Sequence, residues 1–207
     1  MNRNSESMKT SSNPAGRIAV FASGNGSNAE NIIRYFREAD RGAQVALVVT
    51  NKAEAGVIGR AESLGVETCV LPADRLRDPD TILPLLEARG VDLIVLAGFL
   101  LMVPPFLIAR YPGRIINIHP SLLPAYGGKG MYGRRVHEAV VEAGESRTGI
   151  TVHFVSEKYD DGRIIAQIPV EISPSDSAAD VESKIHRLEK EHFPRIIHET
   201  FYNNNEQ

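Results

Sequence analysis

Short apolar segments alternate with helical patterns along most of this chain, and this alternation restricts the folds open to it. Apolar runs of strand length lie at 18–22, 45–50, 68–71, 93–97 and 115–118. Between the first two runs, apolar residues recur with helical spacing from Ala29 to Phe36. Further helices are expected at 53–64 and 80–89, from Pro104 or Pro105, and at 136–143. The pattern therefore predicts a Rossmann-like α/β fold, with a mostly parallel, twisted sheet and flanking helices.

The character of the sequence changes after residue 150. Residues 150–155 and 164–172 have strand character, and a polar segment with the turn residues Asp160-Asp161-Gly162 joins them. Two strands joined in this way form a hairpin, so we expect an antiparallel C-terminal addition to the sheet edge.

Ser177 and Asp180 have the spacing of a capping box and should start the last helix, which Pro194 should kink or restart. Residues 125–135 are rich in glycine and predict a long surface loop. With no repeat or linker visible, we predict one domain over residues 17–207, after a disordered tail at 1–16.

Composition excludes several classes of protein. The charged residues sum to 23 − 26 = −3, which argues against a broad nucleic-acid-binding face. Cys69 is the single cysteine, so a disulfide within the chain is excluded and a cysteine-based zinc site is not expected. No apolar run approaches the roughly 20 residues of a membrane span, and the polar first segment does not resemble a secretory signal. We expect a cytoplasmic protein that works without a metal or a membrane.

The loop after the first strand, Gly24-Asn25-Gly26-Ser27-Asn28-Ala29, is the first candidate site. A loop between a strand and a helix N-terminus presents free backbone N–H groups, which suit a phosphate. The spacing also fits the dinucleotide fingerprint, but Thr50-Asn51-Lys52 stands where that fingerprint needs an acidic residue. A phosphate monoester is the favoured ligand, a dinucleotide is one alternative, and a tight turn without a ligand is the other.

Asn117 and His119 form the second candidate site. They are two residues apart at a predicted strand end, so both side chains leave the same face of the sheet. An amide can stabilise an oxyanion, and an imidazole can pass a proton near neutral pH, so the pair suits carbonyl chemistry. The alternative is a structural His-Pro turn with Asn117 capping the loop.

Asp160 is the third candidate, since a carboxylate in that loop could reach His119 and stabilise its charged form. A solvated turn is the alternative. We interpret His153, inside a predicted strand, as structural. The last three histidines are six residues apart on one helix and predict no metal site: His186, His192 and His198.

Four segments in this order resemble the phosphoribosylglycinamide formyltransferases, the folate-dependent formyltransferases of purine synthesis. They are Ser23-Gly24-Asn25-Gly26-Ser27-Asn28, Leu96-Ala97-Gly98-Phe99, Asn117-Ile118-His119-Pro120-Ser121-Leu122-Leu123-Pro124 and Gly149-Ile150-Thr151-Val152-His153-Phe154-Val155. The third segment is shared with methionyl-tRNA formyltransferase and formyltetrahydrofolate deformylase, whereas the first distinguishes the family. The resemblance covers about residues 17–200.

The resemblance implies a reaction in which the formyl group of 10-formyltetrahydrofolate passes to the amino group of glycinamide ribonucleotide. Small molecules would be the only partners, and the protein would be a monomer or a homodimer. Two alternatives remain at this point: a deformylase that gives the formyl group to water, and a phosphate-binding module without catalysis.

The resemblance also implies roles for individual residues. The catalytic residues would be Asn117 and His119, which act on the formyl carbonyl, and Asp160, which pairs with His119 and keeps it protonated. Glycinamide ribonucleotide would contact Gly26, Ser27, Asn28 and Glu189. The folate would contact Leu100, Leu101, Met102, Val103 and Asn117, and also Arg75, or Arg77 in its place.

The chain departs from the family at two places. Leu101 stands where some members have arginine, and residues 125–135 are longer than the usual stretch. We expect this longer loop to lie beside the catalytic strand end, where it could modify substrate access.

Overall fold

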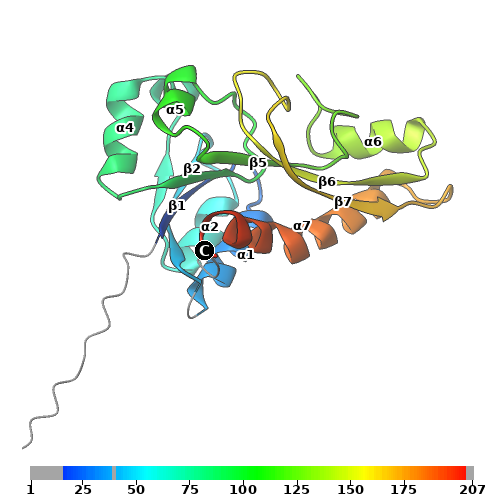
Figure 1. Ribbon diagram of the computed structural model, residues 1–207, viewed down its shortest axis with the longest axis horizontal. Helices are drawn as coiled ribbons and strands as arrows, with labels where there is room; N and C mark the ends of the chain where they lie inside the picture. Colours follow the sequence, from blue (N-terminus) through cyan, green and yellow to red (C-terminus); the bar gives the residue numbers. More distant parts are fainter. Residues whose placement is uncertain (1–15, 39–40, 204–207) are drawn as a thin grey trace, which may run out of the picture.

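A seven-stranded sheet forms the centre of the computed structural model, which describes residues 16–38 and 41–203 (Figure 1). The strands are β1 (Gly16–Phe21), β2 (Ala43–Thr50), β3 (Thr68–Val70), β4 (Leu93–Leu96), β5 (Ile115–His119), β6 (Arg147–Phe154) and β7 (Ile164–Glu171). Their order is β3-β2-β1-β4-β5-β6-β7, with β1 to β5 parallel and β6 and β7 antiparallel. The predicted parallel sheet with an antiparallel C-terminal addition is confirmed.

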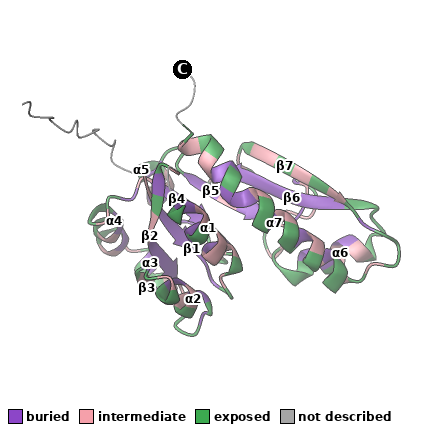
Figure 2. Ribbon diagram, turned by 90° about the horizontal axis from the view of Figure 1, so that it is seen from below, coloured by how far each residue is buried: buried purple, intermediate pink, exposed green. Residues whose placement is uncertain are grey.

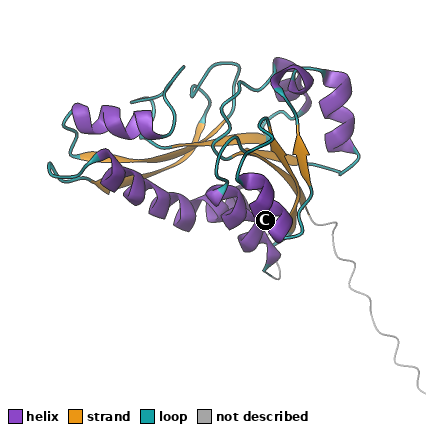
Figure 3. Ribbon diagram, turned by 180° about the vertical axis from the view of Figure 1, so that it is seen from behind, coloured by secondary structure: helices purple, strands orange, loops and turns teal. Residues whose placement is uncertain are grey.

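Helices cover both faces of this sheet, as Figure 3 shows. They are α1 (Ser27–Arg37), α2 (Val57–Ser63), α3 (Ala73–Leu76), α4 (Pro79–Glu87), α5 (Pro105–Arg110), α6 (Arg134–Glu142) and α7 (Ala178–Phe201). Helices α1, α2 and α7 pack with one apolar cluster, and α3, α4 and α5 pack with another on the opposite face. Helix α6 packs against α7. The flanking helices are therefore those of an α/β fold, as predicted.

The apolar runs of the sequence form the buried centre of the sheet (Figure 2). Each residue from Leu93 to Leu96 is buried, as expected for a parallel strand that is covered on both faces. Apolar side chains of β1 alternate between the two clusters, with Ile18 and Val20 on one side and Ala19 and Phe21 on the other. Burying these two layers is the main source of stability for such a sheet.

Helix α7 is continuous through Pro194, so the predicted restart of the helix is wrong, whereas the predicted kink stays a prediction. Proline has no N–H for the carbonyl of Lys190, one turn earlier. The side chain of Asn31 on α1 donates to that carbonyl at 2.8 Å. The helix therefore accommodates the proline because α1 supplies the missing donor. The capping box of Ser177 and Asp180 is present as predicted.

The observed ends of some helices and strands differ from the predicted ones by a few residues. Helix α2 begins at Val57, later than the predicted residue 53, because residues 51–56 form a turn that follows β2. The short helix α3 was not predicted. Gly16, which we counted with the tail, is the first residue of β1; the rest of the predicted tail, 1–15, lies outside the described residues.

The strand order reverses direction at β1, which lies between β2 and β4. Crevices form outside the carboxyl ends of parallel strands at such a switch point, and ligands bind there in α/β sheets. The glycine loop follows β1, residues 97–103 follow β4, and His119 ends β5. The fold thus places three of the predicted segments at one edge of the sheet. Over the described residues, no helix has the length and apolar character needed to cross a membrane.

Candidate active site

A cavity of about 720 Å³ opens at this edge and brings most of the predicted site residues together. Its lining comes from the glycine loop, residues 96–103, the end of β5, the loop before α6, the loop after β6, and α7. Such a volume is typical of a site for small organic molecules.

The glycine loop reaches the cavity as a tight turn into α1. Gly26 is the residue before the helix and has φ 83°, a conformation that glycine adopts without strain. A Cβ there would lie 2.5 Å from the side chain of Val57, so the loop needs glycine for space as well. No side chain caps the first turn of α1. Its N–H groups, beside the side chains of Ser27 and Asn28, remain open to an anion at the positive end of the helix dipole.

Asn28 and Glu189, both predicted to contact the nucleotide, touch each other. The Asn28 Nδ2 atom donates to Glu189 Oε2 at 2.9 Å and joins the start of α1 to α7. Burial raises the pKa of the Glu189 carboxyl above its usual value, although the hydrogen bond from Asn28 acts in the opposite direction. Both residues line the cavity, as the glycine loop does.

Asn117 has a partner that we interpreted as purely structural. In the antiparallel pairing of β5 and β6, His153 stands directly opposite Asn117, so both side chains leave the same face of the sheet. Asn117 Nδ2 lies 3.1 Å from His153 Nε2, and His153 Nδ1 lies 2.9 Å from the carbonyl oxygen of Phe154. Because a carbonyl only accepts, Nδ1 carries the proton and Nε2 accepts from the Asn117 amide. His153 belongs to the site and orients Asn117.

His119 is almost fully buried at the end of β5, between two oxygen atoms. Its Nε2 donates to the carbonyl oxygen of Tyr126 at 2.8 Å, and its Nδ1 lies 3.6 Å from Asp160 Oδ1. Burial lowers the pKa of His119 below its ordinary value, and although Asp160 and the Tyr126 carbonyl both raise it, burial outweighs them. In the free protein, burial therefore opposes the expected effect of Asp160, which is to keep His119 protonated.

Asp160, and not Asp161, faces His119, as predicted. Its Oδ2 accepts from the N–H of Gly128 at 2.8 Å, and its Oδ1 lies 3.7 Å from His153 Nε2. Burial raises the pKa of the Asp160 carboxyl, but His153, His119 and the Gly128 N–H together bring it below its usual value. Asp161 is exposed and lies 3.7 Å from Lys158. The carboxylate that faces the imidazole is thus ionised.

The predicted folate residues fall into two groups. Leu100, Leu101, Met102 and Val103 all line the cavity, next to residues 96–99. Ser23 ties this segment to the glycine loop, since its Oγ accepts from the N–H of Leu100 at 2.9 Å. Arg75 and Arg77, by contrast, are not among the described residues that line the cavity, and Arg75 lies 3.8 Å from Asp78.

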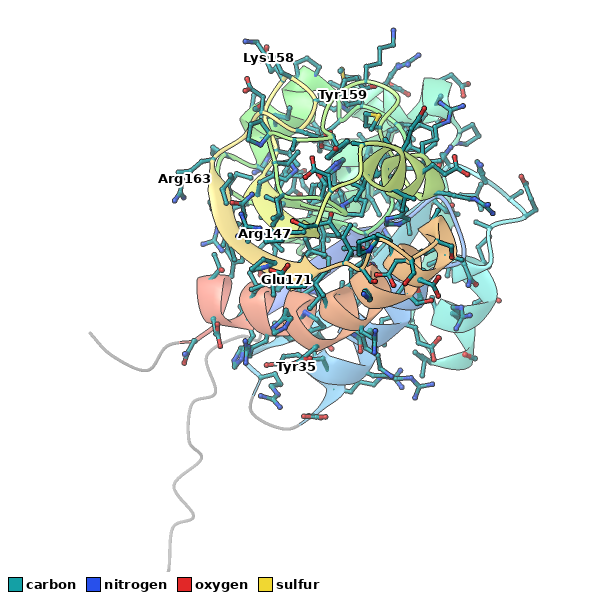
Figure 4. The ribbon with its side chains drawn as sticks, turned by 90° about the vertical axis from the view of Figure 1, so that its right-hand side faces the viewer. Tyr35, Arg147, Lys158, Tyr159, Arg163 and Glu171 are labelled. Atoms are coloured by element: carbon teal, nitrogen blue, oxygen red, sulfur yellow. The ribbon has the colours of Figure 1, made fainter. Side chains whose placement is uncertain are left out.

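The rim of the cavity contains exposed side chains from two loops. Figure 4 shows Lys158 and Tyr159 on the loop between β6 and β7, at the end of the molecule away from Tyr35. Residues 128–133 of the glycine-rich loop also line the cavity. The expectation that this loop lies beside the catalytic strand end is confirmed.

Several lining residues were not predicted. His137 of α6 is buried, with no partner for its Nδ1 among the described residues, and it faces Glu182 and His186 of α7. Only the packing of α6 against α7 brings these groups to the cavity, and neither helix pattern reveals that contact. His153 could have been found by pairing the two strands in register. Within the described part of the chain, no three His, Cys, Asp or Glu side chains gather as a metal site.

Comparison with known proteins identifies the family. Residues 16–197 match the model of the formyl transferase family. The chain is 39% identical over 193 residues to a Bacillus subtilis protein named phosphoribosylglycinamide formyltransferase, and the match covers 91% of this chain and 96% of that protein. It is 41% identical over 181 residues to the chloroplastic phosphoribosylglycinamide formyltransferase of Arabidopsis thaliana. This match covers 85% of this chain and 61% of the plant protein. The chain thus spans about three fifths of the plant relative's length.

Solved structures agree with these relatives. A crystal structure of glycinamide ribonucleotide transformylase 1 from Geobacillus kaustophilus superposes with a TM-score of 0.82 at 38% identity, over 90% of this chain and 98% of that one. The phosphoribosylglycinamide formyltransferase structure from Bacillus halodurans has a TM-score of 0.81 at 35% identity, over 90% of this chain and 96% of that one. Sequence and fold therefore lead to the same family.

Proposed function

The chain belongs to the formyl transferase family, and we propose that it transfers the formyl group of 10-formyltetrahydrofolate to the amino group of glycinamide ribonucleotide. The products are formylglycinamide ribonucleotide and tetrahydrofolate, and the reaction is a one-carbon transfer of purine biosynthesis. One observation carries this proposal above the others. The open N-terminus of α1 and the pair Asn117 and His119 line the same cavity, so a phosphorylated amine and a carbonyl donor can meet there.

The nucleotide half of the cavity would hold glycinamide ribonucleotide. The backbone of Gly26, Ser27 and Asn28 offers N–H groups to the phosphate at the positive end of α1. The Glu189 carboxylate, held by Asn28, is an acceptor for hydroxyl or amine hydrogens of the substrate. The hydrogen bond between Asn28 and Glu189 holds both side chains in place before the substrate binds. This lowers the entropy that is lost on binding.

The folate half would hold the formyl donor along the apolar wall of Leu100, Leu101, Met102 and Val103. Leucine at position 101 makes this wall apolar where some family members have arginine. A contact of the folate with Arg75 or Arg77 stays a prediction. Holding two substrates side by side in one cavity supplies much of the rate, because it replaces a bimolecular encounter.

The chemical step follows from the groups around the formyl carbon. The substrate amine attacks that carbon, a C–N bond forms, and the carbonyl oxygen becomes an oxyanion that accepts from the Asn117 amide. Neutral His119 takes the proton that the amine loses, and the ionised Asp160 stabilises the imidazolium while it lasts. The bond from the formyl carbon to the folate nitrogen then breaks, and His119 returns the proton to that nitrogen. At the end of the cycle each of these residues has the charge with which it began.

A deformylase is the second candidate, since it would use the same carbonyl groups with water as the acceptor. The phosphate loop favours the transferase, because water needs no phosphate site. The experiment is an assay of tetrahydrofolate formation with and without glycinamide ribonucleotide. The transferase produces it only when the amine is present, whereas equal rates in both samples would contradict the proposal.

Three further expectations stay predictions: the domain over residues 17–207, a cytoplasmic location, and a monomeric or homodimeric state. The expected independence from a metal is also a prediction, which treatment of the protein with a chelator before the assay would test.

A further inference from the structure

Residues 98–103, which we call the folate segment, are held to the rest of the protein by Ser23. The segment has no helix or strand, and Leu100 is 41% and Met102 43% exposed, so packing in the core holds only part of it. Among the described residues, both hydrogen bonds between this segment and other parts of the chain are made with Ser23. Its backbone N–H donates to the Gly98 carbonyl oxygen at 3.0 Å, and its Oγ accepts from the Leu100 N–H at 2.9 Å.

Asn51 directs the Ser23 hydroxyl. A peptide N–H can only donate, so Ser23 Oγ is the acceptor in its bond with Leu100. The hydroxyl hydrogen is then donated to Asn51 Oδ1, which lies 2.6 Å from Oγ. Ser23 is only 2% exposed, so little water is present to replace either partner. The amide of Asn51 therefore keeps a lone pair of Oγ directed at the folate segment.

These contacts join the carboxyl ends of three neighbouring strands. Ser23 follows β1, Asn51 follows β2 and Gly98 follows β4, and β1 lies between the other two strands in the sheet. From Ser23 the chain continues directly into the glycine loop, which would bind the phosphate of the nucleotide. Neither Ser23 nor Asn51 is among the described residues that line the cavity. The pair therefore connects the two halves of the site from behind, without a place in its lining.

We propose that Ser23 and Asn51 are positioning residues, whose hydroxyl–amide pair fixes the folate segment relative to the glycine loop and so places the formyl donor against the nucleotide amine. The inference rests on the proposed function for the identity of the two ligands. Alignment of two bound reactants supplies much of the rate of such a reaction. The inference also gives a role to Asn51, which stands where a dinucleotide site needs an acidic residue for the ribose.

Two pairs of substitutions test this contact, each with a disruptive and a conservative member. Ser23→Ala removes the acceptor for Leu100, whereas Ser23→Thr keeps a hydroxyl. Asn51→Leu removes the acceptor that directs this hydroxyl, whereas Asn51→Asp keeps one. Ser183→Ala is the control for loss of a hydroxyl, since Ser183 is exposed on α7 and its Oγ donates to the Ala179 carbonyl of the same helix. Thermal unfolding shows first that each variant is folded.

The direct readout is hydrogen exchange of the Leu100 amide, followed in ¹H–¹⁵N spectra of the protein labelled with ¹⁵N-leucine. In Ser23→Ala and Asn51→Leu we expect this exchange to become about fivefold faster, the scale for loss of one hydrogen bond. The Kd for tetrahydrofolate and the KM for 10-formyltetrahydrofolate should rise by roughly the same factor, while the KM for glycinamide ribonucleotide stays within about twofold. Ser23→Thr and Asn51→Asp should recover most of the affinity for the folate, and Ser183→Ala should match the wild type.

Wild-type exchange at Leu100 in Ser23→Ala would overturn the inference, as would faster exchange with an unchanged Kd for tetrahydrofolate. An equal rise of both KM values would also overturn it, because a general loss of stability has that effect. The exchange and the Kd need no reaction. A protein that shows both expected effects, but no amine-dependent formyl transfer, would refute the proposed function and leave the role of Ser23 in positioning the folate segment intact.

Discussion

The amide of Asn117 donates to Nε2 of His153 at 3.1 Å, across the antiparallel pair of β5 and β6. This bond uses one of the two N–H bonds of the amide and fixes its plane. The second N–H is then directed by the first and remains available for an oxyanion. His153 therefore acts on the reaction through Asn117, which is the group that would contact the substrate.

His153→Phe should lower kcat about tenfold, because the Asn117 amide loses the partner that orients it, and should leave both KM values within about twofold. His192→Phe on α7 is the matched control, since that histidine lies outside the lining of the cavity. The measurement is steady-state kinetics with both substrates varied. A wild-type kcat in the His153 variant would show that the Asn117 amide does not need His153 for its orientation.

Asp160→Asn should lower kcat by 10²-fold or so, because a neutral amide cannot stabilise the imidazolium of His119. Asp160 raises the pKa of His119, so its removal lowers that pKa further. The acid-side limb of the pH–rate profile, where neutral His119 becomes protonated, should move to lower pH or disappear.

Asp161→Asn is the control for that change, since Asp161 points to solvent beside Lys158. Its kcat and its pH profile should match those of the wild type. A loss of activity in Asp161→Asn with a normal Asp160→Asn variant would contradict the assignment of the carboxylate.

Asn28→Ala should raise the KM for glycinamide ribonucleotide about tenfold and leave the KM for the folate unchanged, since Asn28 lies in the nucleotide half of the cavity and holds Glu189. Asn31→Ala is a matched control from the same helix. It removes a bond to α7 at the Lys190 carbonyl, so it should lower the Tm without changing either KM. An equal rise of KM in both variants would mean that Asn28 acts only by docking α1 on α7.

The stability of the protein should fall as the pH drops below about 6.5, the ordinary pKa of histidine. Burial lowers the pKa of His137 in the folded state, against Glu182, which raises it. The unfolded chain therefore binds a proton that the folded chain resists, so this contribution is complete above about 6.5 and is lost as the pH falls through it. Burial lowers the pKa of His119 as well, and it acts in the same direction.

His137→Gln should reduce the drop in Tm between pH 8 and pH 5.5 by a few degrees, since about 1 kcal/mol moves Tm by roughly 2–4 °C at this size. Scanning calorimetry at both pH values measures it. The same drop in the variant as in the wild type would show that His137 is already protonated in the folded state, or that it contributes nothing to the pH dependence.

The parts of the structure that follow local patterns could be predicted from the sequence. The strands are visible as apolar runs, and the glycine loop is visible because a strand, a turn and a helix follow each other there. His119 and Asn117 are recognisable at a strand end. Asp160 could be chosen over Asp161 only through the resemblance to a family, because turn composition alone does not say which carboxylate faces inward.

The remainder depends on contacts between distant segments. His153 enters the site through the register of two strands, and the Tyr126 carbonyl reaches His119 through the path of a loop. The surroundings of His119 also could not be predicted, because its burial and its distance from Asp160 both depend on how distant segments pack. Pro194 is expected to kink or restart the last helix, and the donor that lets α7 continue past it comes from α1.

The most direct test of the central claim follows the formyl group itself. The protein is mixed with 10-formyltetrahydrofolate that carries ¹³C in its formyl carbon, with and without glycinamide ribonucleotide, and the labelled products are identified by NMR. The account predicts that the label enters an amide of the ribonucleotide in step with tetrahydrofolate formation, and that it stays on the folate when the ribonucleotide is absent. Release of the label as formate at the same rate in both samples would contradict it.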